Sequence, residues 1–279
     1  ATSDPARPVL TRSRLRDLAD RHGLTPSRAL GQNFVVDPNT VRRIARLAGV
    51  GPGDRVVEIG TGLGALTLAL VETGASVTTI EADRHLVPAL DEVLADVEVH
   101  RVVADAREVD WDELLGGHDR WVLVANLPFN VATPLVLDLL DDVPAIERML
   151  VMVQREVAER LAAAPGDAAF GLPSLKVRLW AEAEIVGAVS ADVFSPRPRV
   201  ASPLQSIHRA AGPAVAGDPH RLVELARTAF GQRRKMLRRS LAGAVSPEAF
   251  ETAGIDPASR PQDLDVGDWA RLAQAAGGR

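Results

Sequence analysis

A short segment near the middle of the chain, Asn126-Leu127-Pro128-Phe129, carries the groups needed to activate an aromatic amine. Such an amine is a poor nucleophile because its lone pair is delocalised into the ring. The amide oxygen of Asn126 and the backbone carbonyl of Pro128 can accept its two N–H bonds, which would draw the nitrogen toward a tetrahedral, nucleophilic state. Phe129 adds a ring that can stack on a base and whose face suits a passing cation. The segment therefore predicts chemistry at the exocyclic amine of a base such as adenine.

A glycine-rich run, Glu58-Ile59-Gly60-Thr61-Gly62-Leu63-Gly64, lies where a predicted strand gives way to a helix. Glycines there let the backbone approach a ligand at the electropositive start of the helix. Glu81 follows at about the twenty-residue spacing at which a carboxylate can hold ribose hydroxyls. NAD and S-adenosylmethionine both fit this pattern. The amine-activating segment favours S-adenosylmethionine, and a nicotinamide-dependent oxidoreductase remains an alternative that leaves the segment unexplained.

These residues must be positioned by strands that alternate with helices. The apolar periodicity predicts strands over 56–59, 77–80, 99–103, 121–124 and 149–153, and helices over 13–21, 37–48, 63–72 and 84–94. Such alternation predicts a mostly parallel sheet covered on both faces, with ligands bound at the carboxyl ends of its strands.

The second half of the chain follows a different pattern. Residues 176–186 and 204–208 are predicted to be an antiparallel pair of strands at the sheet edge, because no convincing helix separates them. Residues 210–217 have the composition of a linker, and helices are predicted over 219–230, 232–241, 247–253 and 266–276. We therefore expect an α/β, Rossmann-like catalytic domain over 1–210, including an N-terminal segment of about 50 residues, and a small all-helical domain over 211–279.

Composition narrows the classes of function. The chain has no cysteine, and its six histidines lack metal-ligand spacing, so we expect no metal. It shows neither a membrane-length apolar stretch nor a leader, which predicts a cytoplasmic protein, and we expect a monomer.

The formal net charge of -5 argues against a nucleic-acid partner at first sight. The basic residues are nevertheless clustered. Candidates for RNA contact are Arg197 and Arg199 in a proline-rich segment, and Arg233, Arg234, Lys235 and Arg238 in a stretch without acids.

Several motifs, taken in order, resemble those of the ribosomal RNA adenine N6-dimethyltransferases. They are Leu30 to Phe34, Glu58 to Thr67, Asp105-Ala106, Asn126 to Pro134, Phe194 to Val200, and Phe230-Gly231-Gln232-Arg233-Arg234-Lys235. The chain looks most similar to the kasugamycin-sensitivity type, which acts on small-subunit rRNA and is related to the macrolide-resistance methyltransferases of the large subunit. The resemblance extends from about Leu24 to the last helix.

The resemblance also implies roles for individual residues. The segment Gln32-Asn33-Phe34-Val35 would fold over S-adenosylmethionine, with Asn33 and Val35 in contact. The remaining implied roles are the methionine side for Gly60 and Gly62, the ribose for Glu81, the cofactor's adenine amine for Asp105, the target amine for Asn126 to Phe129, and the opposite face of the flipped base for Phe194.

The expected function is methylation of adenine amines in rRNA within a ribosomal subunit or its precursor. The favoured target is a pair of adjacent adenines near the 3′ end of 16S rRNA, modified during ribosome biogenesis. Two departures from the usual pattern, Ala201-Ser202-Pro203 and Phe170-Gly171-Leu172-Pro173, are expected near the RNA-facing side and leave the target open. A paralogue that methylates 23S rRNA for antibiotic resistance and a non-catalytic ribosome-assembly factor therefore remain alternatives.

Overall fold

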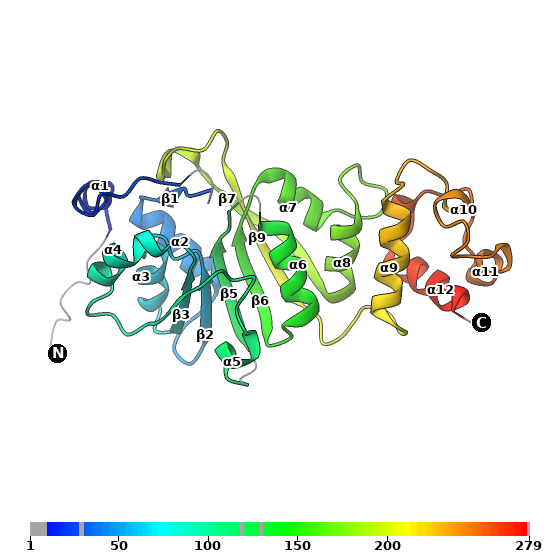
Figure 1. Ribbon diagram of the computed structural model, residues 1–279, viewed down its shortest axis with the longest axis horizontal. Coiled ribbons are helices and arrows are strands. Elements are labelled where there is room, and N and C mark those ends of the chain that lie inside the picture. The colour runs from blue at the N-terminus through cyan, green and yellow to red at the C-terminus, as the bar shows by residue number, and fades with distance from the viewer. Residues whose placement is uncertain (1–9, 28–30, 118–119, 129–130, 278–279) are drawn as a thin grey trace. The chain divides into compact units, whose positions relative to one another are not determined.

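A computed structural model describes residues 10–27, 31–117, 120–128 and 131–277. Its main feature is a seven-stranded sheet in the order β4-β3-β2-β5-β6-β9-β7 (Figure 1). The strands are β2 (Arg55–Ile59), β3 (Ser76–Glu81), β4 (His100–Val103), β5 (Trp121–Asn126), β6 (Ile146–Met152), β7 (Ala181–Val189) and β9 (Ser202–Arg209). The pairs β3/β4, β2/β3, β2/β5 and β5/β6 are parallel, so their carboxyl ends meet at one edge.

The central strands consist almost entirely of apolar residues because both faces of the sheet are covered. Val56 and Val57 in β2 and Leu123 and Val124 in β5 have no exposed surface. Buried runs of this kind are typical of parallel sheets with helices on each side. The prediction of an α/β sheet from this alternation is confirmed.

Helices follow most strands, and capping residues mark where they begin and end. They are α1 (Arg12–Arg21), α2 (Pro38–Ala48), α3 (Ala65–Val71), the 3-10 helix η1 (Arg84–Leu86), α4 (Val87–Val93), α5 (Trp111–Leu115) and α6 (Ala132–Asp142). For α2, the Asp37 side chain accepts from the backbone N–H of Thr40 at 2.8 Å, and Gly49 ends the helix with φ +61°. The predicted stripe Val41, Ile44, Ala45 and Ala48 is buried.

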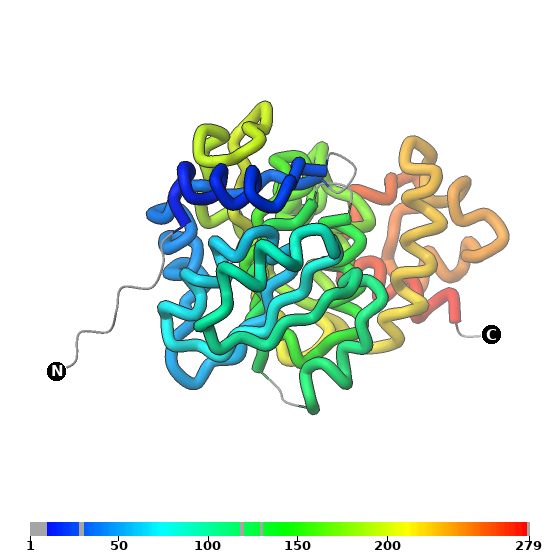
Figure 2. Tube along the Cα trace, turned by 60° about the vertical axis from the view of Figure 1, so that its left-hand side comes forward, coloured from blue at the N-terminus to red at the C-terminus, as the bar shows by residue number. Residues whose placement is uncertain are grey.

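The N-terminal helix α1 packs beside α4, as Figures 1 and 2 both show. Its Leu15 and Leu18 are buried in a cluster that includes Leu90 of α4. The Arg21 guanidinium donates to both carboxylate oxygens of Glu92 at 2.7 and 2.9 Å, and this pairing lowers the pKa of Glu92 to about 2.

A second, two-stranded sheet joins β1 (Phe34–Val35) to β8 (Phe194–Ser195) in antiparallel register. The 3-10 helix η2 (Ala191–Val193) comes immediately before β8, and the carbonyl of Val193 accepts from the backbone N–H of Val36 at 2.8 Å. This small sheet ties the N-terminal segment to the chain that precedes the proline-rich stretch.

Contacts divide the chain into two compact units that alternate along the sequence. Unit 1 comprises residues 1–155 and 185–206, and unit 2 comprises residues 156–184 and 207–279. The sequence-based division at residues 210 and 211 differs, because it assigns 156–184 to the first domain.

Unit 2 is helical, with one aromatic-centred core. Its helices are α7 (Arg155–Ala162), α8 (Leu172–Trp180), α9 (Pro219–Phe230), α10 (Leu237–Ser240), α11 (Pro247–Ala253), η3 (Pro261–Asp263) and α12 (Val266–Ala276). The Phe230 ring lies between those of Phe170 and Trp269, with ring centroids 6.2 and 6.1 Å away. Leu175 and Leu179 of α8 belong to the same core.

Two predicted elements are wrong in this half of the chain. Residues 176–180, the first part of the strand predicted over 176–186, form the end of α8, which begins at Leu172; β7 begins at Ala181. The predicted helix over 232–241 is reduced to α10, because Met236 has an extended backbone (φ -62°, ψ 150°). Arg233, Arg234 and Lys235 of the basic run therefore lie in the turns between α9 and α10, and Arg238 lies in α10. No helix in the described part of the chain is long and apolar enough to cross a bilayer.

Candidate functional site

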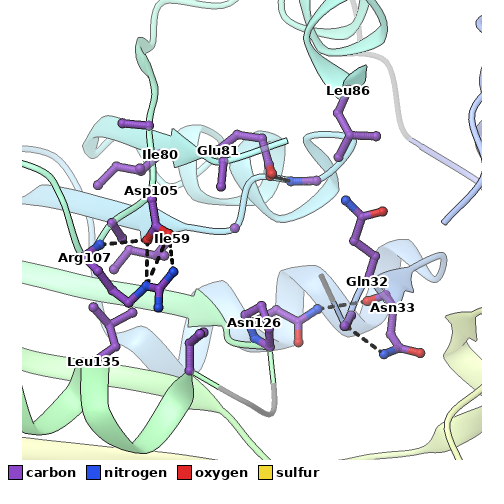
Figure 3. Close-up of a pocket in the computed structure, with 18 of the residues that line it drawn as sticks. Gln32, Asn33, Ile59, Ile80, Glu81, Leu86, Asp105, Arg107, Asn126 and Leu135 are labelled. Atoms are coloured by element: carbon purple, nitrogen blue, oxygen red, sulfur yellow. Dashed lines mark hydrogen bonds and ion pairs between the residues drawn. The ribbon is translucent and has the colours of Figure 1, made fainter. Parts of the chain in front are cut away.

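An open pocket lies at the carboxyl ends of β4, β3, β2 and β5, where parallel sheets bind ligands (Figure 3). It comprises about 930 Å³ of non-protein space, part of which is open solvent, and its lining residues all belong to unit 1. The residues that line it include Gln32, Asn33, Phe34, Ile59, Gly60, Gly62, Ile80, Glu81, Asp105, Arg107, Asn126, Pro128 and Leu135. Most of the predicted cofactor residues are thus brought together.

The glycine run forms the turn from β2 into α3. Gly60 and Gly62 have φ values of +79° and +58°, a backbone region that favours glycine. A Cβ on Gly62 would stand 3.0 Å from the Phe34 ring, and one on Gly60 would stand 3.3 Å from the Asn126 carbonyl oxygen. The sequence predicted close approach by a ligand, and the structure shows that neighbouring protein groups also require the glycines.

Glu81, at the end of β3, is held by two backbone N–H groups. Its Oε2 accepts from Gly62 at 2.7 Å and its Oε1 accepts from Asp83 at 2.8 Å. The side chain is buried, and this burial raises its pKa. Each carboxylate oxygen keeps acceptor capacity, so the group is oriented to accept from a pair of hydroxyls.

Glu58, the first residue of the glycine-rich run, lies near the end of β2 and is buried. Its Oε2 accepts from the Thr67 hydroxyl at 2.5 Å, while its Oε1 has no hydrogen-bond partner among the described residues. Burial raises the pKa of Glu58 to about 8. The protonated carboxylic acid is therefore the dominant form near neutral pH.

Asn126, the last residue of β5, is oriented by the N-terminal segment. Its Nδ2 donates to the Asn33 backbone carbonyl at 3.0 Å (Figure 3). A carbonyl can only accept, so the amide nitrogen must face Asn33 and the amide oxygen must face the other way. No described residue donates to that oxygen, which is available to an incoming N–H.

The Pro128 carbonyl, predicted to accept from the target amine, already has hydrogen-bond partners within the protein. The Pro128 carbonyl accepts from the backbone N–H groups of Val131 and Ala132, at 3.2 and 3.1 Å, where α6 begins. A carbonyl oxygen has two lone pairs, so these bonds use the acceptor that was predicted to bind the target amine. Leu127 is buried, its N–H donates to the Met152 carbonyl at 3.2 Å, and no described residue donates to its own carbonyl. Phe129 lies outside the described residues.

The N-terminal segment crosses the pocket and is fastened by Gln32. The Nε2 of Gln32 donates to Asp83 Oδ2 at 2.8 Å, and its Oε1 accepts from the Ser27 N–H at 2.8 Å. Asn33 Nδ2 donates to the Gly31 carbonyl at 3.0 Å. Phe34 also lines the pocket, although no contact was predicted for its side chain.

Val35 and Phe194 lie away from the pocket, in the core. Both are buried in one apolar cluster, with Val35 7% and Phe194 3% exposed, and they are partners in the small sheet. Side chains alternate in a strand, so when Phe34 faces the pocket, Val35 faces the core. The base-stacking role expected for Phe194 and the cofactor contact expected for Val35 stay predictions, and neither side chain lines the pocket.

Asp105 stands just beyond β4 and is paired with Arg107. The Arg107 Nη2 donates to Asp105 Oδ2 at 2.5 Å, and the hydrogen bonds from this guanidinium lower the pKa of Asp105. Arg107 was not among the residues predicted from the sequence. A basic residue two positions after Asp105 is the feature of the sequence that could have indicated this pairing.

The basic candidates are surface residues, with differences among them. Arg197 pairs with Asp192 at 2.9 Å and Arg199 is exposed. In the other run, Arg234, Lys235 and Arg238 are exposed, whereas Arg233 is partly buried and donates to the Ala168 carbonyl at 2.9 Å. Arg233 thus makes a structural contact that the other arginines of the run do not make. Within the described residues, no three acidic, histidine or cysteine side chains are grouped so that they could hold a metal.

Comparison with known proteins gives consistent matches over the whole chain. A sequence model of the family described as "Ribosomal RNA adenine dimethylase" matches residues 24–276. The Ribosomal RNA small subunit methyltransferase A of Thermobifida fusca is 45% identical over 277 residues, covering 95% of this chain and 96% of that protein. The protein of the same name from Kineococcus radiotolerans is 44% identical, with 95% and 91% covered.

Solved structures agree on the fold. A dimethyladenosine transferase from Plasmodium falciparum matches with a TM-score of 0.72 at 22% identity, over 85% of this chain and 94% of that chain. The 23S rRNA methyltransferase ErmE matches with a TM-score of 0.64 at 26% identity, over 87% and 98%.

Proposed function

The chain belongs to the ribosomal RNA adenine dimethylase family, and from this premise we propose that it transfers methyl groups from S-adenosylmethionine to adenine amines of small-subunit rRNA. The observation that carries the proposal is the orientation of Asn126, whose amide oxygen is left available at the end of β5. Relatives that are named as small-subunit enzymes favour that subunit over the large one.

The order of strands supports the choice of cofactor. Asp105, Glu81, Gly60 and Asn126 lie at the carboxyl ends of β4, β3, β2 and β5, which are neighbours in that order. Parallel strands lie about 4.8 Å apart, so these groups extend across the sheet edge over roughly 14 Å. An adenosyl sulfonium fits this order: its adenine at Asp105, its ribose hydroxyls at Glu81 and its amino-acid part at the glycine turn. When bound, the cofactor supplies an electrophilic methyl group.

The protein's part is to make the target nitrogen nucleophilic. Asn126 Oδ1 accepts one N–H bond of the flipped adenine, and the Leu127 carbonyl takes the place of the Pro128 carbonyl as acceptor of the other. Two such acceptors hold the lone pair out of conjugation with the ring and fix its direction. Stacking of the base by Phe129 and Phe194 remains part of this proposal as a prediction, since Phe129 lies outside the described residues and Phe194 is buried away from the pocket.

The partner is ribosomal RNA in a subunit or its precursor, contacted through Arg197, Arg199, Arg234, Lys235 and Arg238, by a monomer in the cytoplasm. Of the two departures from the usual family pattern, Phe170 is buried, whereas Ala201 is half-buried. A paralogue that methylates 23S rRNA therefore stays an alternative, which the methyl-transfer experiment decides.

Methyl transfer from labelled S-adenosylmethionine to small subunits, large subunits and free rRNA, with the modified base mapped, tests the proposal. We expect dimethyladenine in small-subunit rRNA. Label on 23S rRNA alone would favour the resistance paralogue, and tight binding of NAD without S-adenosylmethionine would replace the function altogether. An unchanged cellular effect of Asn126→Ala would favour the non-catalytic assembly factor.

A further inference from the structure

The Asp105 carboxylate is engaged by one neighbouring residue, Arg107. Oδ1 accepts from the Arg107 backbone N–H at 3.0 Å and from its Nε at 3.1 Å. Oδ2 accepts from Nη2 at 2.5 Å and from Nε at 3.2 Å. A carboxylate offers about four acceptor positions, so these contacts use the capacity of the group.

The Arg107 side chain can also move away from Asp105. Its side chain is 55% exposed, and its guanidinium makes no hydrogen bond to any described residue other than Asp105. Both residues line the pocket, and Figure 3 shows the Arg107 side chain beside Leu135 and Ile59, the apolar residues against which a purine would lie. The guanidinium therefore occupies the donor position that an amino group on the purine would need.

We propose that Arg107 is a specificity-determining residue that competes with the adenine amino group of the cofactor for the Asp105 carboxylate. This inference rests on the proposed function, because it takes S-adenosylmethionine as the ligand. The amino group must displace the guanidinium before it can donate to Asp105. Arg107 thereby lowers the affinity of the site for adenosyl ligands, and it weakens the preference for an amino group over a carbonyl at that place on the purine.

Binding of S-adenosylhomocysteine and of S-inosylhomocysteine, measured by calorimetry, tests this competition. In Arg107→Gln the adenosyl ligand should bind about 1.4- to fivefold more tightly, the range expected for an exposed ion pair of about 0.2–1 kcal/mol. The inosyl ligand, which has a carbonyl oxygen in place of the amino group, should not gain. In the Asp105→Asn background, Arg107→Gln should have no effect on either ligand.

Salt provides a second readout. Screening weakens the exposed Arg107–Asp105 pair, so affinity for S-adenosylhomocysteine should rise with ionic strength in the unaltered protein and stay flatter in Arg107→Gln. Weaker or unchanged binding by a folded Arg107→Gln variant would overturn the inference while leaving the proposed function in place. Failure of the unaltered protein to bind either ligand would overturn both.

Discussion

The two polar atoms of the Asn126 amide have different roles, one as a hydrogen-bond donor and one as an acceptor. Its nitrogen is bound to the Asn33 carbonyl, and its oxygen is available to the target amine. An aspartate at this position would present oxygen at both ends, and the end near Asn33 would meet another acceptor. An amide is therefore required at this position, because a carboxylate of the same shape cannot donate to the Asn33 carbonyl.

Asn126→Ala and Asn126→Asp should each slow methyl transfer by about two to three orders of magnitude, the loss seen when a preorganised polar group is removed from a reacting centre. Affinity for S-adenosylhomocysteine should change little, because the amide faces the target base. Single-turnover rates with small subunits, alongside calorimetry, provide the measurement. An Asn126→Asp variant with near-normal rates would contradict the proposed role of the amide.

Glu58 makes stability depend on pH. Burial raises its pKa to about 8 from an ordinary value of 4.5. The unfolded chain ionises this group near 4.5, so its contribution to stability is fully present below that pH and is lost as the pH rises toward 8. Burial also raises the pKa of Glu81, which adds a dependence of the same sign.

Glu58→Gln, which keeps the shape and stays neutral, should reduce the fall in the free energy of unfolding between about pH 5 and pH 8.5. Urea titrations at several pH values measure this. The exposed Glu184 provides the matched control, since Glu184→Gln should leave the profile unchanged. A Glu58→Gln profile as steep as that of the unaltered protein would mean that Glu58 is ionised in the folded state.

At the scale of elements, the segment before β1 connects the cofactor side of the pocket to the target side. Gln32 anchors it to Asp83, and one residue later the Asn33 carbonyl holds Asn126. A looser segment would therefore affect both binding and chemistry.

Gln32→Ala should weaken S-adenosylhomocysteine binding and lower the single-turnover rate, the latter by about fivefold or more, as expected for the loss of a charge-assisted hydrogen bond. Asp83→Asn should act in the same direction, because its Oδ1 accepts from the His85 N–H and an amide nitrogen would then face Gln32. Arg84→Ala, next to Asp83 but without this bond, is the control. A rate loss with unchanged ligand affinity would show that the segment serves Asn126 alone.

The turns between α9 and α10, together with α10 itself, combine RNA candidates with a structural arginine. Joint replacement of Arg234, Lys235 and Arg238 by alanine should weaken binding of small-subunit rRNA and flatten its salt dependence, by about 0.7–0.9 in the log–log slope for each phosphate that is no longer neutralised. Arg260→Ala is a control elsewhere in unit 2. Arg233→Ala should instead lower the melting temperature, because it removes the bond to Ala168. An unchanged slope in the triple variant would exclude this run from the interface.

On the scale of the whole molecule, the units do not follow a single cut in the sequence. Helix α8 precedes the linker in the sequence. Its Leu175 and Leu179, together with the preceding Phe170, are nevertheless buried in the same core as residues of α9 and α12. The domain division predicted near residue 211 therefore differs from the bounds of the two compact units.

A fragment that ends at residue 210 should bind the dye ANS and aggregate, because it would expose Phe170, Leu175 and Leu179. Light scattering and dye fluorescence, compared with the full chain, measure this. A fragment that stays monomeric and binds no dye would show that 156–184 folds without the C-terminal helices.

The sequence predicted most of the sheet and the position of the pocket, because apolar periodicity and glycine spacing are local properties. It could not predict that the Pro128 carbonyl is used by α6, since that depends on where the helix begins. Nor could it predict that Phe194 pairs with Val35, a contact between segments far apart in the chain. The first five residues of the strand expected over 176–186 are helical because α8 starts earlier, at Leu172, and a short apolar stretch fits either a helix or a strand.

The main-chain carbonyl that holds Asn126 has an evolutionary consequence. Every amino acid supplies the same backbone carbonyl. Selection at position 33 therefore acts only on the side chain, and the bond to Asn126 does not depend on which side chain stands there. The side chain at position 33 should therefore change among descendants of this chain without a matched change at position 126, where the amide is kept. Covariation between columns of an alignment would miss a contact on which the chemistry depends.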